Sequence, residues 1–185
     1  MTVEEALKQP GRKLLVSSDG ESGQRIVTVY SVADGGAKQI AATTVPAAEH
    51  DALVAKLQAG GGELAESEDN TRIVWVISGD HIEAFDQRSR QLDASGDSAT
   101  TKDGKTVKRS EIAQVFSWAS DDYAHRGIKA ALRSGDEVRL VTEISLAATG
   151  DPTYGRNELL FDSGWCTTLG RAIATWAGVE FENKI

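Results

Sequence analysis

The chain has 185 residues, of which 40% are hydrophobic and 26% charged, as in a globular domain with its own hydrophobic core. Its formal net charge of −8 at pH 7 opposes binding to nucleic-acid phosphates and to anionic membranes. The single cysteine, Cys166, excludes an intramolecular disulfide, and the N-terminal residues have no apolar signal-peptide stretch. We therefore expect a cytoplasmic protein that binds neither nucleic acid nor membrane.

The first third of the sequence predicts a helix, several strands and a second helix. Thr2 and Glu5 have the spacing of a capping box, which favours a short helix at the start. The Asp-Gly-Gly sequence at residues 34–36 is a tight-turn signal between two segments of strand character. His50 begins an apolar stripe that continues three, four and seven residues later, as on one face of a helix. The expected strands are residues 13–17, 25–33 and 37–45, and the expected helix runs from Pro46 to the glycines at 60–62.

Beyond residue 62 the pattern is mostly that of β-strands. Residues 72–78 are apolar on both faces, as in a central strand, and a turn leads from them into a strand at residues 81–86. Residues 87–105 are polar and lack periodicity, so we expect a long loop there. Three alternating segments then predict an antiparallel meander with one buried face. These segments are residues 112–118, 128–132 and 138–144.

The last predicted element is an amphipathic helix. Apolar residues recur every three or four positions, so they form one face that we expect to pack on the sheet. The helix begins either at Asn157 or near Asp162. The later start is favoured because Asp162 is satisfied as an N-cap but costly beside an apolar stripe. The stripe consists of Phe161, Trp165, Leu169, Ile173 and Trp176.

The fold class that follows is α+β. We expect an antiparallel β-meander or sandwich-like sheet packed by a C-terminal amphipathic helix, after an N-terminal ββα segment. Over about residues 63 to 180, this element order is similar to pleckstrin-homology-like architecture, and the resemblance implies a binding module. Residues 1–62 are expected to belong to the same body as residues 63–185, with two packed subdomains as the alternative.

The common catalytic motifs are absent from the sequence. It contains no G-x-S-x-G, no P-loop, no H-E-x-x-H and no G-x-G-x-x-G, and one cysteine cannot form a paired-cysteine metal site. We expect no cofactor and no bound metal. Each of the three histidines is a candidate acid–base group only where the fold supplies a partner. Cys166 lies on the apolar side of the predicted helix, so we expect it to be buried. The basic run at residues 102–109 is interpreted as a solvated arm.

The best candidate site is the polar turn that precedes the C-terminal helix. Its connection is longer than needed, and long ordered connections often carry function. Arginine and tyrosine are frequent in interfaces, and arginine binds carboxylates or phosphates. The candidate ligand- or partner-binding residues are Asp151, Tyr154, Arg156, Asp162 and His125.

Two classes of function are compatible with these patterns. The first is a non-enzymatic binding or regulatory module with a protein partner, for which the acidic surface suits a basic partner. The alternative is a small-ligand-binding protein or an enzyme with an unfamiliar site around residues 151–162. Two tryptophans on one helix, Trp165 and Trp176, also allow a weak homodimer beside the monomer if the sheet leaves them exposed.

Overall fold

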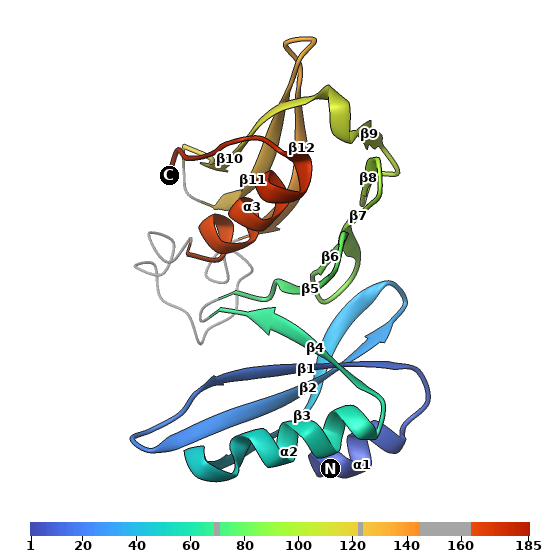
Figure 1. Cartoon of the computed structure of the whole chain (residues 1–185), viewed down its shortest axis with the longest axis vertical. Helices are drawn as coiled ribbons and strands as arrows, with labels where there is room; N and C mark the ends of the chain where they lie inside the picture. Colours follow the sequence, from blue (N-terminus) through green and yellow to red (C-terminus); the bar gives the residue numbers. More distant parts are fainter. Residues whose placement is uncertain (69–70, 122–123, 145–163) are drawn as a thin grey trace. The chain divides into compact units, whose positions relative to one another are not determined.

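The structure, a computed structural model, describes residues 1–68, 71–121, 124–144 and 164–185 (Figure 1). It is mostly β-sheet with a few helices, which confirms the expected α+β class. The chain divides into two compact units. The first unit comprises Met1–Glu66 and Phe85–Ser89, and the second comprises Ser67–Ala84 and Arg90–Ile185. That residues 1–62 and 63–185 form one body stays a prediction.

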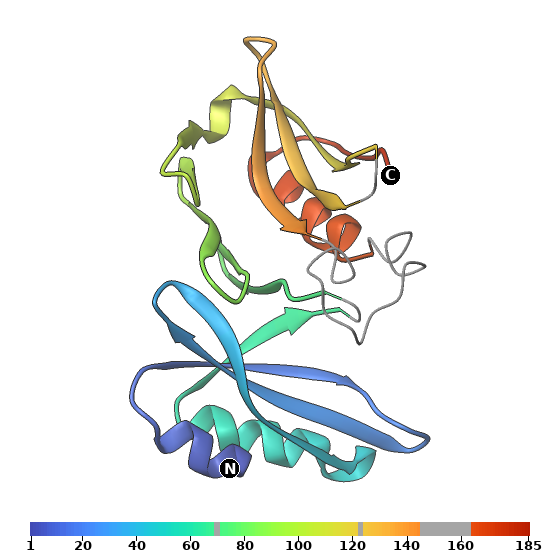
Figure 2. The ribbon, with the colours of Figure 1, turned by 180° about the vertical axis from the view of Figure 1, so that it is seen from behind.

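The first unit is a sheet with two helices on one face, as Figures 1 and 2 show from opposite sides. Its elements are α1 (Val3–Lys8), β1 (Arg12–Asp19), β2 (Gln24–Ala33), β3 (Gly36–Pro46), α2 (Ala47–Ala59) and β4 (Gly62–Ser67). The strand order is β3-β2-β1-β4; β2 pairs antiparallel with both β1 and β3, and β4 pairs parallel with β1. The sequence does not predict β4, because the strand has only six residues, begins at the last of the glycines that end α2, and alternates only weakly in burial.

Local sequence signals explain most of the first unit. The capping box is confirmed: the Thr2 side chain accepts a hydrogen bond from the Glu5 amide at 3.1 Å, and Glu5 accepts one from the Thr2 amide at 2.8 Å. The β2–β3 turn places Asp34 at φ 54° and Gly35 at φ 83°, which is the left-handed geometry of a tight hairpin. The core lies between the sheet and the helices, and Leu57 of α2 is its most deeply buried helical leucine, at 1% exposure.

The second unit contains a ladder of short strands and a separate four-stranded sheet. In the ladder, β5 to β9 lie in sequence order, and in the sheet the order is β12-β11-β10-β13. Strand β13 pairs parallel with β10, and the other two pairings are antiparallel. The elements are β5 (Val74–Ser78), β6 (His81–Phe85), β7 (Arg90–Ser95), β8 (Ser98–Thr101), β9 (Thr106–Lys108), the 3-10 helix η1 (Arg109–Glu111), β10 (Ile112–Ala119), β11 (His125–Leu132), β12 (Glu137–Ile144), α3 (Gly164–Ala177) and β13 (Phe181–Asn183).

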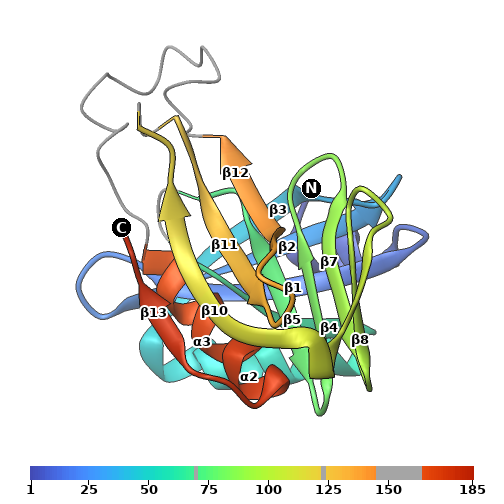
Figure 3. The same cartoon turned by 90° about the horizontal axis from the view of Figure 1, so that it is seen from above.

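The C-terminal helix packs on the sheet, as the sequence predicts. Figure 3 shows α3 against β10 and β11, with β13 beside β10. Trp165 and Trp176 are 0% and 5% exposed, so α3 does not leave the aromatic patch that would favour a homodimer. Gly170 is needed at the contact with β13, because a Cβ atom there would lie 2.3 Å from the Phe181 ring. Both predicted starts of the helix, Asn157 and Asp162, lie outside the described residues.

The expected loop at residues 87–105 is wrong. The structure places strands β7 and β8 and the turn before β9 in this segment. Leu92, Ala94 and Ala99 are each at most 1% exposed and join the core of the second unit. Alternation is hard to see in the segment because alanine occupies two of the buried positions, and serine and threonine occupy positions beside them. Among the helices of the described ranges, none has the length and apolar character needed to cross a membrane.

Candidate functional site

The second unit has a shallow cleft of about 400 Å³ where α3 faces the turn between β5 and β6. The turn contributes Gly79 and Asp80, and the strands on either side contribute Ile77 and Ile82. The first residue of η1, Arg109, closes another side. All of these groups belong to the second unit, so the cleft is formed within one compact part of the chain.

The periodicity of α3 determines what the helix presents to the cleft. The apolar face that contains Leu169 and Ile173 turns into the core. Arg171 and Thr175 are four residues apart, so they lie on one exposed side of the helix, and both line the cleft. Trp176, at 5% exposure, belongs to the core and also lines the cleft beside these two residues.

The two arginines of the cleft differ in their surroundings. Arg109 lies 3.7 Å from a carboxylate oxygen of Asp80, and its guanidinium carbon is 5.5 Å from the centre of the Trp176 ring. These contacts hold Arg109 in one orientation. Arg171 is exposed and forms neither an ion pair nor a hydrogen bond with any other described residue. With two guanidinium groups and one carboxylate, the cleft carries a local positive charge.

Apolar surface lies next to these charges. Ile77 is 46% exposed, at the end of β5 where the strand leaves the core. Ile82 and Trp176 form a buried wall beside it, at 3% and 5% exposure. The cleft therefore combines a free cation with an exposed apolar contact, as binding sites for amphipathic ligands do.

The lining of the cleft contains one carboxylate and one hydroxyl group that belong to side chains. Its lining residues, as far as the structure describes the chain, include no histidine, cysteine, glutamate or lysine. The Thr175 hydroxyl therefore has no general base beside it, and Asp80 is engaged by Arg109. No group of three or more histidine, cysteine, aspartate or glutamate residues within the described ranges is placed to hold a metal ion.

The structure does not test most of the sequence-predicted site. Asp151, Tyr154, Arg156 and Asp162 lie outside the described residues, and a site around residues 151–162 stays a prediction. His125 is described: it is the exposed first residue of β11. Its amide donates to the Ser120 hydroxyl at 3.0 Å and its carbonyl accepts from the Ser120 amide at 2.8 Å, so its backbone is bound to Ser120. It does not line the cleft.

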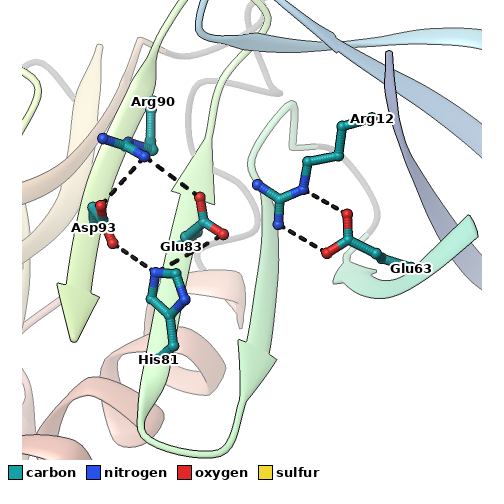
Figure 4. A network of polar contacts seen from close by, with 6 residues as sticks. All are labelled: Arg12, Glu63, His81, Glu83, Arg90 and Asp93. Atoms are coloured by element: carbon teal, nitrogen blue, oxygen red, sulfur yellow. Dashed lines mark hydrogen bonds and ion pairs between the residues drawn. The ribbon is translucent and has the colours of Figure 1, made fainter. Parts of the chain in front are cut away.

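A second polar cluster in this unit involves His81 on the β6–β7 hairpin (Figure 4). Its Nε2 lies 2.6 Å from an Asp93 carboxylate oxygen. The guanidinium of Arg90 lies 3.2 Å from Asp93 and 3.6 Å from the buried carboxylate of Glu83. The four side chains satisfy one another across two strands, so they stabilise the hairpin. The other pair in Figure 4, Arg12 and Glu63 of the first unit, forms a bidentate bond of 2.6 and 3.0 Å between β1 and β4.

A buried ion pair joins β11 to β12 in the second unit. Arg126 and Glu143 are each 5% exposed and 3.8 Å apart. The Glu143 carboxylate also accepts hydrogen bonds from the Thr71 hydroxyl at 3.0 Å and the Arg72 amide at 2.9 Å. Desolvation nevertheless raises the pKa of Glu143, and burial likewise raises the pKa of the Cys166 thiol, which makes it a poor nucleophile. The hydrogen bonds from Thr71 and Arg72 to Glu143 anchor the segment before β5.

Sequence patterns gave only indirect signals for the cleft. The spacing of Arg171 and Thr175 places them together on the polar side of the predicted helix. Interpreting residues 102–109 as a solvated arm does not predict a role for Arg109. The contact of Arg109 with Trp176 joins residues far apart in the sequence. Ile77 is predicted within a central strand, where exposure is not expected, and no local pattern reveals that its end of the strand is open.

Comparisons with known proteins do not change this picture. No protein family matches the sequence, and no curated protein matches it.

Proposed function

We propose that the protein is a binding module whose cleft accepts an acidic segment of a partner protein. The observation that carries the proposal is Arg171, an exposed guanidinium without an ion-pair partner among the described residues, beside an exposed apolar side chain. In a chain of net charge −8, a free arginine has many possible acidic neighbours, yet this one faces a cleft. A carboxylate from another molecule is the complementary group.

The electrostatics of the cleft favour a carboxylate ligand. A carboxylate can bind Arg171 without displacing any existing partner, so the cost of breaking an internal bond does not arise. Arg109 is fixed by Asp80 and by the Trp176 ring, and it adds positive potential without having to move. The planar guanidinium of Arg171 can form two parallel hydrogen bonds with one carboxylate.

The apolar part of the cleft favours a peptide over a small inorganic anion. Ile77 and the wall beside it offer a surface for an aliphatic side chain next to the carboxylate, and its burial contributes about 25 cal/mol per Å². A shallow cleft of this kind supports weak binding of a short peptide and stronger binding of a folded partner that covers more surface. The preferred segment is therefore an acidic residue flanked by aliphatic residues.

The experiment uses two matched peptides, acetyl-Leu-Glu-Leu-amide and acetyl-Leu-Gln-Leu-amide, titrated into the ¹⁵N-labelled full chain. The indole N–H signal of Trp176 reports binding at the cleft. We expect the glutamate peptide to bind about three- to tenfold more tightly than the glutamine peptide, which corresponds to about 0.7–1.4 kcal/mol for a partly solvated charge-assisted pair. Arg171→Gln should reduce the affinity for the glutamate peptide by a similar factor.

The control variant is Arg139→Gln on β12. Arg139 is also exposed, has no ion-pair partner in the described part of the chain, and lies 4.8 Å from a tryptophan ring, that of Trp118. The Arg139→Gln variant should bind both peptides with unchanged affinity. Equal affinity for the two peptides, or an Arg171→Gln variant that binds like the unmodified chain, would overturn the proposal.

A further inference from the structure

Three residues of the first unit are arranged like a nucleophile, a base and an orienting acid. The hydroxyl oxygen of Ser17 lies 2.8 Å from Nε2 of His50. The other ring nitrogen of His50, Nδ1, lies 2.9 Å from a carboxylate oxygen of Asp51. These are the atom pairs that a serine–histidine–aspartate constellation requires, and it is recognised by geometry and not by sequence order. They lie in the other compact unit from the cleft.

The fold explains why these side chains meet. Ser17 follows Leu15 by two residues on β1, so both face the helices of the first unit. His50 begins the buried stripe of α2, whose leucine Leu57 packs against the same core. The histidine therefore points toward the sheet, where Ser17 is half-buried. Asp51, the next residue of α2, is fully exposed and reaches back to His50.

The hydrogen bonds assign a role to each ring nitrogen. When Nδ1–H donates to Asp51, Nε2 keeps its lone pair and accepts a hydrogen bond from the Ser17 hydroxyl. This is the tautomer that a general base needs. Since Asp51 is exposed to water, it orients the ring less firmly than a buried carboxylate would. Asp51 is thus a positioning residue.

A hydrogen-bond donor without a partner lies on the same face of the sheet. Val27 is opposite Ser17 in the β1–β2 register, and Arg25 is two residues from Val27 on that face. The Nε atom of Arg25 is buried and has no hydrogen-bond partner in the described part of the chain. A diagonal neighbour on a sheet is within reach of a long side chain, so Arg25 can donate to an oxygen bound next to Ser17.

We propose that Ser17, His50 and Arg25 form a site that hydrolyses small esters. The Ser17 oxygen attacks the carbonyl carbon while His50 takes the hydroxyl proton, and Arg25 donates to the carbonyl oxygen as it becomes negative. The ester C–O bond breaks, and the alcohol leaves with the proton from His50. Water, deprotonated by His50, then attacks the acyl-serine, and the carboxylic acid departs as Ser17 recovers its proton. The half-buried position of Ser17 restricts the acyl group to a small one.

The test is acetylation of the full chain by p-nitrophenyl acetate, followed by peptide mapping. Ser17 should be acetylated at least tenfold faster than Ser18, the neighbouring serine on the opposite face of β1. Mapping needs no substitution, so it is independent of the folding of any variant.

Substitutions separate a catalytic site from a hydrogen bond that only joins β1 to α2. His50→Gln should slow Ser17 acetylation by about a hundredfold, because glutamine cannot accept the hydroxyl proton. Asp51→Asn should slow it only a few-fold because the carboxylate is exposed. Ser18→Ala is the control and should change nothing. Equal labelling of the two serines, or labelling of Ser17 that is unaffected by His50→Gln, would overturn the proposal without affecting the one made for the cleft.

Discussion

Replacement of Lys13 by methionine removes a buried charge next to the end of α1. Lys13 is 2% exposed on β1, and its ammonium nitrogen donates to the carbonyl oxygens of Gln9, Pro10 and Gly11, each at 2.9 Å. Gln9 is the C-cap residue of α1, and Pro10 and Gly11 follow it, so these three bonds join the connection after α1 to β1. Methionine keeps most of the apolar stem and removes the charge and its three donors.

The stability that Lys13→Met removes is the contribution of the three hydrogen bonds, reduced by two effects. A hydrogen bond to a charged group contributes about 1.5–3 kcal/mol, so three of them set an upper limit of roughly 4.5–9 kcal/mol. Gln9, Pro10 and Gly11 are exposed, so water replaces much of what their carbonyls lose. Methionine also avoids the cost of burying an ammonium group. We expect Lys13→Met to lower the local stability of the first unit by about 2–3 kcal/mol.

Hydrogen exchange measures this loss where it occurs. Amides of α1 and β1 should exchange about 30- to 150-fold faster in Lys13→Met, which is the expected free energy expressed as a rate ratio. Lys38→Met on β3, where the lysine is exposed, is the matched control and should change exchange less than about threefold. An exchange rate in Lys13→Met within threefold of the unmodified protein would refute the reasoning. Tryptophan fluorescence reports the second unit separately, since it contains all four tryptophans: Trp75, Trp118, Trp165 and Trp176.

Two further predictions concern buried titratable groups of the second unit. The folded protein binds the proton of Glu143 more tightly than the unfolded chain does, because its pKa is raised mainly by desolvation. This contribution to stability is complete below the ordinary carboxyl range and is lost as pH rises through the raised pKa. Glu143→Gln should therefore remove this loss of stability with rising pH, measured by urea unfolding followed by tryptophan fluorescence. Cys166 is 0% exposed and its thiol pKa is raised by burial. Iodoacetamide should therefore alkylate it at least about a hundredfold more slowly in the folded protein than in urea, and similar rates would contradict its burial.

Much of the fold could be predicted because its signals are local. The capping box at Thr2 and the turn at residues 34–36 depend on a few adjacent residues, and both are found where expected. The apolar spacing around Leu169 predicts the buried face of α3 for the same reason. Strand β13 escapes prediction because it has only three residues and depends on its pairing with β10.

The candidate sites were harder to predict because they depend on contacts between distant segments. The position of His50 on a helical stripe follows from the sequence, but its contact with Ser17 depends on how α2 packs on β1. The cleft likewise needs Arg109 and Trp176 to meet, and neither a motif nor a period links them. Arg171 has only the ordinary appearance of a charged residue on the outer side of a helix.

The net charge and the cleft lead to different expectations about the partner. A chain of net charge −8 attracts a basic protein at long range and repels an acidic one. The Debye length at physiological ionic strength is about 8 Å, so carboxylates far from the cleft are largely screened there. The nearest groups then dominate, and Arg171 with Arg109 outweighs Asp80. A partner that is basic overall and carries one acidic segment flanked by aliphatic residues satisfies both conditions, since its net charge favours the encounter and its acidic segment favours the bound state.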